Sequence, residues 1–344
     1  MTQGPTVERI VAARRGRQHR RRLTLLTMSL VLIVLFVMSQ MFGQTFYSLG
    51  EVVRVILGQN VPGASFTVAE LRLPRASLAV LVGAAFGLAG VTFQTMLRNP
   101  LASPDIIGIS SGASAAAVIG IVVLSWDQRA VSIAAVTAAL GTALMIYVLA
   151  FKDRVVGTRL ILIGIGIAAM LDSVIAYVII GASAFDVQIA MRWLTGSLNG
   201  ATWEQVLPVL AAVAIFGPLL LTQASNLSVL QQGDDSATAL GVRVERTRLI
   251  SILAAVALIS FATAATGPIA FVAFLSGPIA ARIVSSGSLL IPAALIGALL
   301  VVAADLLGQY AFGTRYPVGV ITGALGAPYL IYLLIHINRA GESL

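Results

Sequence analysis

Acidic side chains within apolar segments are the first residues of this chain that could do chemistry, because an ionised group inside a bilayer is costly and is usually functional. Asp172 lies in the middle of one apolar segment and Asp305 lies late in another. Asp172 could line the path of a solute, or it could be paired with hydroxyl groups or water inside a helix bundle. For Asp305, near the end of its segment, a structural role is favoured.

Catalysis and metal binding are not expected of this chain. The run Ile109–Gly112 offers serines, but a serine nucleophile needs a base within hydrogen-bonding reach. The two histidines, His19 and His336, lie in the basic amino-terminal tail and at the far end of the last apolar segment. There is no cysteine and no His/Glu cluster that could hold zinc. An intramembrane hydrolase is therefore the least favoured class, and we expect no catalytic residue, metal site or cofactor in this chain.

No phosphate-binding loop is present either. Such a loop ends in Gly-Lys-Ser/Thr, whereas the single lysine, Lys152, follows Phe151. If the chain transports a solute against its concentration gradient, the energy would therefore come from ATP bound to a separate subunit or from an ion gradient.

The composition is that of an integral membrane protein. Hydrophobic residues make up 58% of the 344 positions and charged residues only 10%, against about 25% charged in soluble domains. The formal charge of +8 is explained by cytoplasmic loops facing anionic lipid, and we expect no nucleic-acid partner. The apolar run after Arg22 continues to Phe42 without a small-residue cleavage site, so it is interpreted as a membrane helix and not as a signal peptide.

The apolar pattern predicts an all-α integral membrane protein with about ten transmembrane helices. The expected spans are 23–43, 74–96, 107–125, 130–151, 159–181, 205–223, 248–266, 268–284, 289–310 and 317–337. With both termini in the cytoplasm, only Arg54, Arg72, Arg75, Arg129, Arg192 and Arg315 of the 22 basic residues lie outside. The positive-inside rule favours this orientation. It gives a basic cytoplasmic tail over 1–22, one transmembrane domain over 23–338 and a short cytoplasmic tail over 339–344.

The longest inner loop, 224–247, contains a predicted short helix. Asp234 and Asp235 are typical of a helix start, Ala237 and Leu240 continue it, and Gly241 is typical of a helix end. Such a helix could dock into a groove of a soluble partner, or it could be a simple connector.

Several short motifs, in this order, resemble the FecCD-type permeases, which are the membrane subunits of ABC importers for ferric siderophores, haem and cobalamin. The resemblance covers about 46–338. The motifs are Leu71–Arg75, Asn99–Ala102, Gly108–Ala113, Leu240–Val242, Gly267–Val272, Ala304–Leu306, Pro317–Val320 and Gly326–Pro328.

The resemblance implies a cobalamin/siderophore importer permease-like bundle in the cytoplasmic membrane, paired with a second permease subunit. It also implies two ATPase subunits, which carry ATP and magnesium, and an extracytoplasmic solute-binding protein. It assigns Arg72 and Arg75 to docking of that protein, and Asn99 and Leu101 to the cytoplasmic gate. The alternative for the two arginines is that they extend to lipid phosphate at the membrane surface. The resemblance favours ATPase coupling over a simple connector for the loop helix, with the residues Asp234, Asp235, Ala237, Leu240 and Gly241.

Two positions depart from the family pattern. Gly277-Pro278 stands where such proteins usually have Pro-His or Pro-Gln, so the polar contact of that second residue is lost. Gln309 stands where some relatives have an arginine that adds to docking, and Arg315 is expected to compensate. We expect a permease that moves an iron chelate, above all a ferric siderophore, by alternating access. An ion-coupled secondary transporter, with Asp172 in its path, is the alternative.

Overall fold

The structure, a computed structural model, describes residues 5–105, 108–150, 157–284 and 286–341. Lys152 and Arg154 of an expected inner loop, and the tail from Glu342, lie outside these residues. Over the described ranges the chain is helical, without strands. Its elements are α1 (Pro5–Met41), α2 (Leu49–Ile56), a π-helical turn η1 (Thr67–Arg72), α3 (Leu73–Leu97), α4 (Ile109–Val122), α5 (Gln128–Ala150), α6 (Gly157–Ile180), α7 (Ala184–Leu194), α8 (Trp203–Thr222), α9 (Ala224–Leu230), α10 (Asp234–Ala239), α11 (Val244–Thr266), α12 (Val272–Ile283), α13 (Leu290–Tyr310) and α14 (Val318–Gly341).

Each of the ten expected spans corresponds to a helix in the described part of the chain. Seven of these helices are long and apolar enough to cross a membrane, and α4, α12 and the apolar part of α14 are shorter. The span expected at 268–284 begins only at Val272, because the segment from Gly267 to Phe271 is not helical. Its 12 residues rise only about 18 Å, less than a bilayer core of roughly 30 Å. Helices α2, α7 and α9 were not expected.

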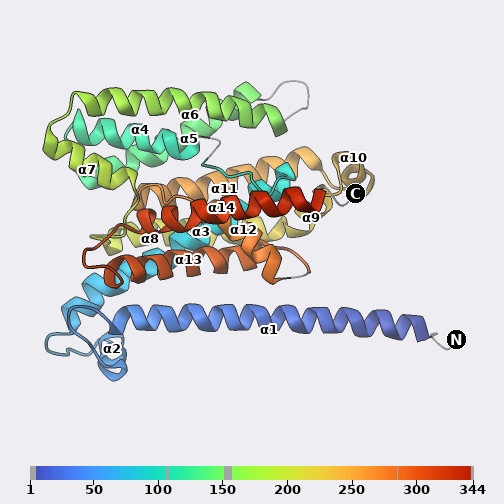
Figure 1. Cartoon of the computed structure of the whole chain (residues 1–344), viewed down its shortest axis with the longest axis horizontal. Helices are drawn as coiled ribbons and strands as arrows, with labels where there is room; N and C mark the ends of the chain where they lie inside the picture. The colour runs from blue at the N-terminus through green and yellow to red at the C-terminus, as the bar shows by residue number, and fades with distance from the viewer. Residues whose placement is uncertain (1–4, 106–107, 151–156, 285, 342–344) are drawn as a thin grey trace.

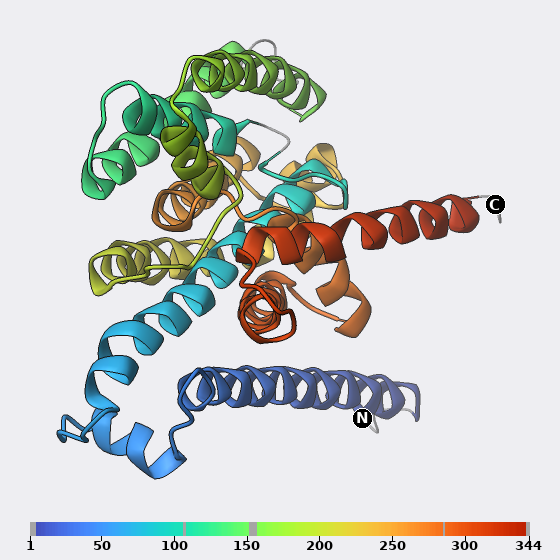
Figure 2. The ribbon, with the colours of Figure 1, turned by 60° about the vertical axis from the view of Figure 1, so that its left-hand side comes forward.

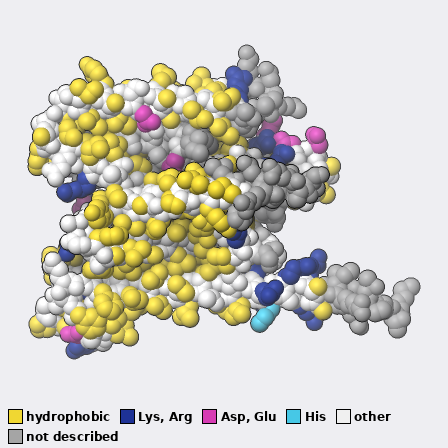
Figure 3. Space-filling model, viewed as in Figure 1, with side chains coloured by type: hydrophobic (Ala, Val, Ile, Leu, Met, Phe, Trp, Pro, Cys, Tyr) yellow, Lys and Arg dark blue, Asp and Glu magenta, His cyan; other side chains and the backbone are white. Residues whose placement is uncertain are grey.

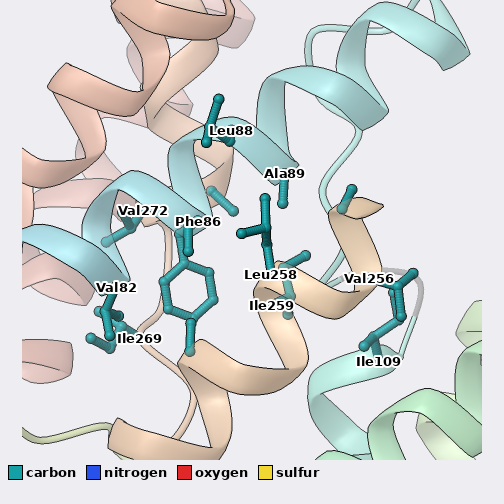
Figure 4. Close-up of a cluster of buried hydrophobic side chains, with 14 of the residues drawn as sticks. Val82, Phe86, Leu88, Ala89, Ile109, Val256, Leu258, Ile259, Ile269 and Val272 are labelled. Carbon is teal, nitrogen blue, oxygen red and sulfur yellow. The ribbon is translucent and has the colours of Figure 1, made fainter. Parts of the chain in front are cut away.

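Helix α3 runs through the middle of the bundle and packs against α13, α11, α12 and α8 (Figures 1 and 2). Its Phe86 is fully buried, and in Figure 4 it lies among side chains of α11 and of the segment before α12, including Leu258 and Ile269. Because α3 is surrounded, it needs no polar face, and it is apolar nearly all round.

The outer helices present large apolar side chains to the surroundings, as the yellow surface in Figure 3 shows. Helix α1 lies along the side of the bundle and packs on it, mainly on α13, through its second half, where Met28 is buried in the core and Leu32 and Leu35 lie against it. Arg21 donates to the carbonyl oxygens of Ser286 and Ser288, and the Tyr310 hydroxyl donates to that of Phe42. The start of α1, the end of α14, α9 and α10 lie at one end of the molecule (Figure 1), as an even number of crossings requires. The cytoplasmic identity of that end stays a prediction of the arginine distribution.

Glycines allow α3 to approach its neighbours at backbone distance. A Cβ atom on Gly87 would overlap the carbonyl oxygen of Ala293 in α13, and one on Gly90 would overlap that of Ala273 in α12. Gly83 and Gly297 face each other in the same way. Small residues have this role in membrane bundles because lipid supplies no hydrophobic force between helices.

We predict that Gly87→Ala lowers the free energy of unfolding by about 1–3 kcal/mol, because α3 and α13 must separate to admit the methyl group. Thermal unfolding of the detergent-solubilised chain would measure this. Gly141→Ala in α5 is the matched control, since a Cβ atom there meets nothing within 4 Å. It should be neutral or stabilising by up to about 1 kcal/mol through helix propensity. Equal effects of the two substitutions would contradict the close-approach argument.

Candidate functional site

A cavity of about 790 Å³ opens between α4, α12 and α14, and we call it the central cavity. The lining is mainly apolar, with a polar group of serines on one side. Its residues are Leu101, Ser103, Asp105, Ser110, Ser111, Ser114, Leu194, Thr195, Pro268, Ile269, Ala270, Phe271, Phe274, Gly319, Val320 and Leu330. Such a lining can admit a solute without binding it tightly.

Asp105 is the one ionisable group in the described lining of the central cavity. It lies in the connection between α3 and α4, where the Ser110 hydroxyl donates to its Oδ1 at 2.7 Å and Ser103 lies 3.4 Å from its Oδ2. Burial raises the pKa of the Asp105 carboxyl above its usual value, against the smaller lowering by the two serine hydrogen bonds. The cavity wall therefore favours the neutral form of its own acid.

Asn99 and Leu101 form a tight turn beneath the central cavity. Helix α3 ends at Leu97, and the next residue, Arg98, adopts the left-handed conformation with φ 51°. The Asn99 Oδ1 then accepts a hydrogen bond from the Leu101 amide at 2.9 Å, as an Asx turn requires. Leu101 is half-buried and packs with Phe274 and Leu333 at the cavity wall. The turn thus places one apolar side chain between the cavity and the end of α3.

Phe271 shapes the opposite wall of the central cavity. This residue precedes α12 and has φ 65°, a conformation unfavourable for a bulky side chain. Its ring lies against Gly326 of α14, where a Cβ atom would overlap the ring, and it meets Phe274 edge to face at 6.4 Å. The pairing of a strained phenylalanine with a glycine fixes α14 against the cavity.

At Gly277-Pro278, where the chain departs from the family pattern, Gln94 of α3 packs against the backbone of α12. Pro278 has no N–H, so the Phe274 carbonyl four residues earlier loses its helical hydrogen bond. The buried Gln94 amide donates to this oxygen at 3.0 Å. Gly277 leaves the space for Gln94, since a Cβ atom there would overlap its Oε1. Gln94 thus satisfies the carbonyl that Pro278 leaves free, and the loss of the contact made by the family's histidine or glutamine stays a prediction.

At the predicted outer end, Arg72 is bound by the connection after α1. Its guanidinium donates to the carbonyl oxygens of Gln40, Met41 and Thr45 at 2.6–3.1 Å. It also lies 4.8 Å from the ring centre of Tyr47. These contacts hold α1 to the start of α3.

Arg75 forms a two-pronged ion pair with Asp305 of α13. Nε and Nη2 of Arg75 donate to the two carboxylate oxygens at 2.9 and 2.7 Å, and Nη1 donates to Asn199 Oδ1 at 2.7 Å. Gln309 donates to Asp305 as well. The side chains of Arg75 and Asp305 are only 18% and 7% exposed, which agrees with the structural role favoured for Asp305. Arg315 is exposed and forms no ion pair with the described part of the chain. Docking by these arginines stays a prediction.

At the other end, α10 is a short helix of 6 residues held to the bundle by Asp234. This carboxylate pairs with Arg98, directly before the Asn99 turn, and with Arg248 of α11 at 2.8 Å. Gly241, with φ 83°, and Val242 end α10 in a Schellman motif, their amides donating to the carbonyls of Thr238 and Ala237.

Within α10, burial differs sharply between the expected coupling residues. Ala237 is fully buried, Leu240 is 65% exposed, and Asp235 is exposed. The predicted coupling segment is therefore anchored in the bundle by Ala237 and presents an exposed apolar side chain, Leu240.

Asp172 lies on the exposed surface of α6 and not at the central cavity. Large apolar side chains surround it on that helix, including Met170 and Tyr177. A role in lining a path stays a prediction.

A bundle of apolar helices, seven of them long enough to cross a bilayer within the described part of the chain, is that of a multi-pass membrane protein. Sequence comparison makes this class a transport protein. Residues 31–336 match the FecCD transport family, and the chain belongs to this family of ABC importer permeases of the cytoplasmic membrane.

Individual proteins similar to the chain agree with this family. It is 38% identical over 294 residues (84% of the chain, 88% of the relative) to the ferric enterobactin transport system permease protein FepG of Escherichia coli. It is 36% identical over 276 residues (79% and 74%) to the cobalamin import system permease protein BtuC of Halobacterium salinarum. A solved structure of a metal-chelate type ABC transporter, in an inward-facing conformation, matches with a TM-score of 0.82 and 25% identity over 91% of the chain and 98% of that structure.

Asp105 and Phe271 were missed as candidate residues. Asp105 stands in a short connection beside Ser103 and Ser110, so an acid flanked by hydroxyl groups between two apolar segments was the available signal. Nothing in the sequence indicates the left-handed conformation of Phe271, which depends on Gly326 from a distant helix.

We predict that wild-type stability depends on pH through Asp105. Because the folded chain raises the pKa of this carboxyl, it holds the proton more tightly than the unfolded chain does. The free energy of unfolding therefore falls as pH rises from the ordinary value of 3.8 through the raised one. Asp105→Asn should lack this decline, so its melting temperature relative to wild type should increase with pH. Asp235→Asn controls for the change in net charge, and parallel curves for wild type and Asp105→Asn would contradict the prediction.

Proposed function

We propose that this chain is the membrane-spanning subunit of an ABC importer that moves an iron chelate, specifically a ferric siderophore, into the cytoplasm. The observation that carries the proposal is its identity of 38%, over most of both chains, with a ferric enterobactin permease. The central cavity supports it, because a chelate has its own ligands around the metal and needs no metal-binding side chains from the permease. Among the described residues no cluster of three or more metal-binding side chains occurs.

The partners of this importer include two ATPase subunits, which hold ATP and magnesium, and a second permease subunit. The surface of α6 supports the second permease, since an ionised Asp172 facing lipid would be costly. Helix α14 also exposes large apolar side chains, including Leu325 and Ile331, beside the central cavity. A second copy or a homologous chain covering these surfaces would enclose the path between the two subunits.

In this mechanism the two ends of α3 have different functions. A solute-binding protein docks at the outer end, where Arg315 is exposed. Arg72 and Arg75 hold the helices at this end in place through their hydrogen bonds. ATP-driven closure of the ATPases moves α10 through Leu240. Asp234 passes the movement to Arg98, and so to the turn that holds Asn99 and Leu101. The gate opens as Leu101 leaves the Phe274 wall, and the chelate passes unchanged.

We predict that uptake in liposomes requires the ATPase subunits, the solute-binding protein and ATP together. Radiolabelled ferric siderophore trapped in the vesicles is the measurement. A proton or sodium gradient across vesicles that contain the permease alone should give no uptake above empty vesicles. Gradient-driven uptake without ATP would instead favour a secondary transporter.

We predict that Arg315→Glu lowers the affinity for the solute-binding protein, whereas Arg75→Glu lowers the stability of the permease. Arg315→Glu reverses an exposed charge, so it should weaken solute-binding protein affinity by about tenfold with little change in melting temperature. Arg75→Glu places a carboxylate against the buried Asp305, which should cost about 3 kcal/mol of stability. Binding assays and thermal unfolding of the purified complex would measure the two effects. Unchanged affinity for the Arg315 variant would contradict its docking role.

A further inference from the structure

A second cavity, of about 820 Å³, is a groove on the side of the bundle. Helices α5 and α8 form its walls, and α11, against which both pack, forms its floor. The small side chains of Ala264 and Ala265, beside Phe261, leave space above the floor. We call this cavity the lateral groove. It shares no lining residue with the central cavity.

The walls of the lateral groove belong to the lipid-facing surface. Ile133 of α5 and Leu207 of α8 line it, and both side chains are 60% exposed. Farther along the same two helices, Leu144 and Ile215 are exposed as well. An apolar channel that is continuous with such a surface has the shape and chemistry to hold a hydrocarbon chain.

The predicted outer end of the lateral groove carries one charge of each sign. Arg129, at the start of α5, and Glu204, at the start of α8, form an ion pair of 3.1 Å, with side chains 71% and 73% exposed. A pair this exposed has little net stability, so a ligand can separate it at low cost. The partners come from opposite walls and therefore bracket the mouth of the groove.

Two tryptophans place this charged pair at the level of lipid headgroups. Trp126 lies just before α5 and Trp203 is the first residue of α8, and both rings are partly exposed. Tryptophan is enriched at the membrane–water interface, because its ring is apolar and its N–H is polar. The apolar groove begins where the headgroup region ends.

We propose that the lateral groove is a binding site for a zwitterionic phospholipid with a primary-amine headgroup, phosphatidylethanolamine. One acyl chain lies over Ala264 and Ala265. The phosphate accepts hydrogen bonds from Arg129, and the ammonium donates to Glu204. The headgroup has both charges in the same molecule, so it replaces the ion pair with two charge-assisted contacts. An anionic lipid satisfies Arg129 alone and leaves Glu204 facing a negative headgroup.

Native mass spectrometry of the full chain, released from detergent after titration with defined lipids, tests the proposal. Wild type should retain phosphatidylethanolamine about three- to tenfold better than phosphatidylglycerol of the same acyl chains. Glu204→Gln should remove or reverse this preference, because Arg129 then faces the headgroup without a competing carboxylate. Arg129→Gln should weaken both lipids by a similar factor. Ala265→Leu, which fills the floor, should weaken both without changing their ratio.

The control is Arg54→Gln, which removes an exposed arginine from α2 at the same end of the molecule and should bind both lipids like wild type. Arg129 and Glu204 are exposed, so their variants should fold even if Ala265→Leu does not. Equal retention of the two lipids by wild type, or a ratio unchanged by Glu204→Gln, would overturn the proposal. So would a wild type that retains neither lipid and pairs with a second copy through this face.

Discussion

The close packing of α3 against its neighbours is the constraint on which the rest of the structure depends. Gly83, Gly87 and Gly90 bring the backbone of α3 into contact with α13 and α12, so this helix is held along its length. One end of α3 carries the ion pair of Arg75 with Asp305, and the other end leads into the turn that starts at Arg98. In the proposed importer, close packing of α3 would let a displacement at one of these ends shift the other.

The need to satisfy backbone groups where a helix breaks explains two of the long-range polar contacts. Gln94 satisfies the carbonyl that Pro278 leaves free, and Arg72 satisfies three carbonyls where α1 ends. Unpaired backbone groups are expensive in lipid, so a helix can break there only where a side chain supplies the missing partner. Polar residues of this kind act as structure, although their chemistry would also suit a ligand.

The helical segments could be predicted because each apolar run has about the length that a bilayer imposes. The short helix α10 could be predicted because Asp234 and Gly241 are typical of its two ends. The late start of α12, at Val272 instead of position 268, could not be predicted. It depends on how Gly267 and Pro268 pack against the end of α7 and the α7–α8 connection. The partner of Arg75 is 230 positions away, and no local pattern indicates such a contact. Asp105 was missed because its burial comes from tertiary packing.

The lining of the central cavity has an evolutionary consequence. Among its described residues, Asp105 is the one with an ionisable side chain, and its burial favours the neutral form. If this cavity is the path in the proposed importer, its wall makes few demands on the charge of the cargo, and a change of cargo would need few substitutions within the membrane. Relatives of this chain are named for cargoes as different as enterobactin and cobalamin. Under the proposed function, a lineage could acquire a new nutrient by exchanging the protein that delivers it, while the permease itself is reused.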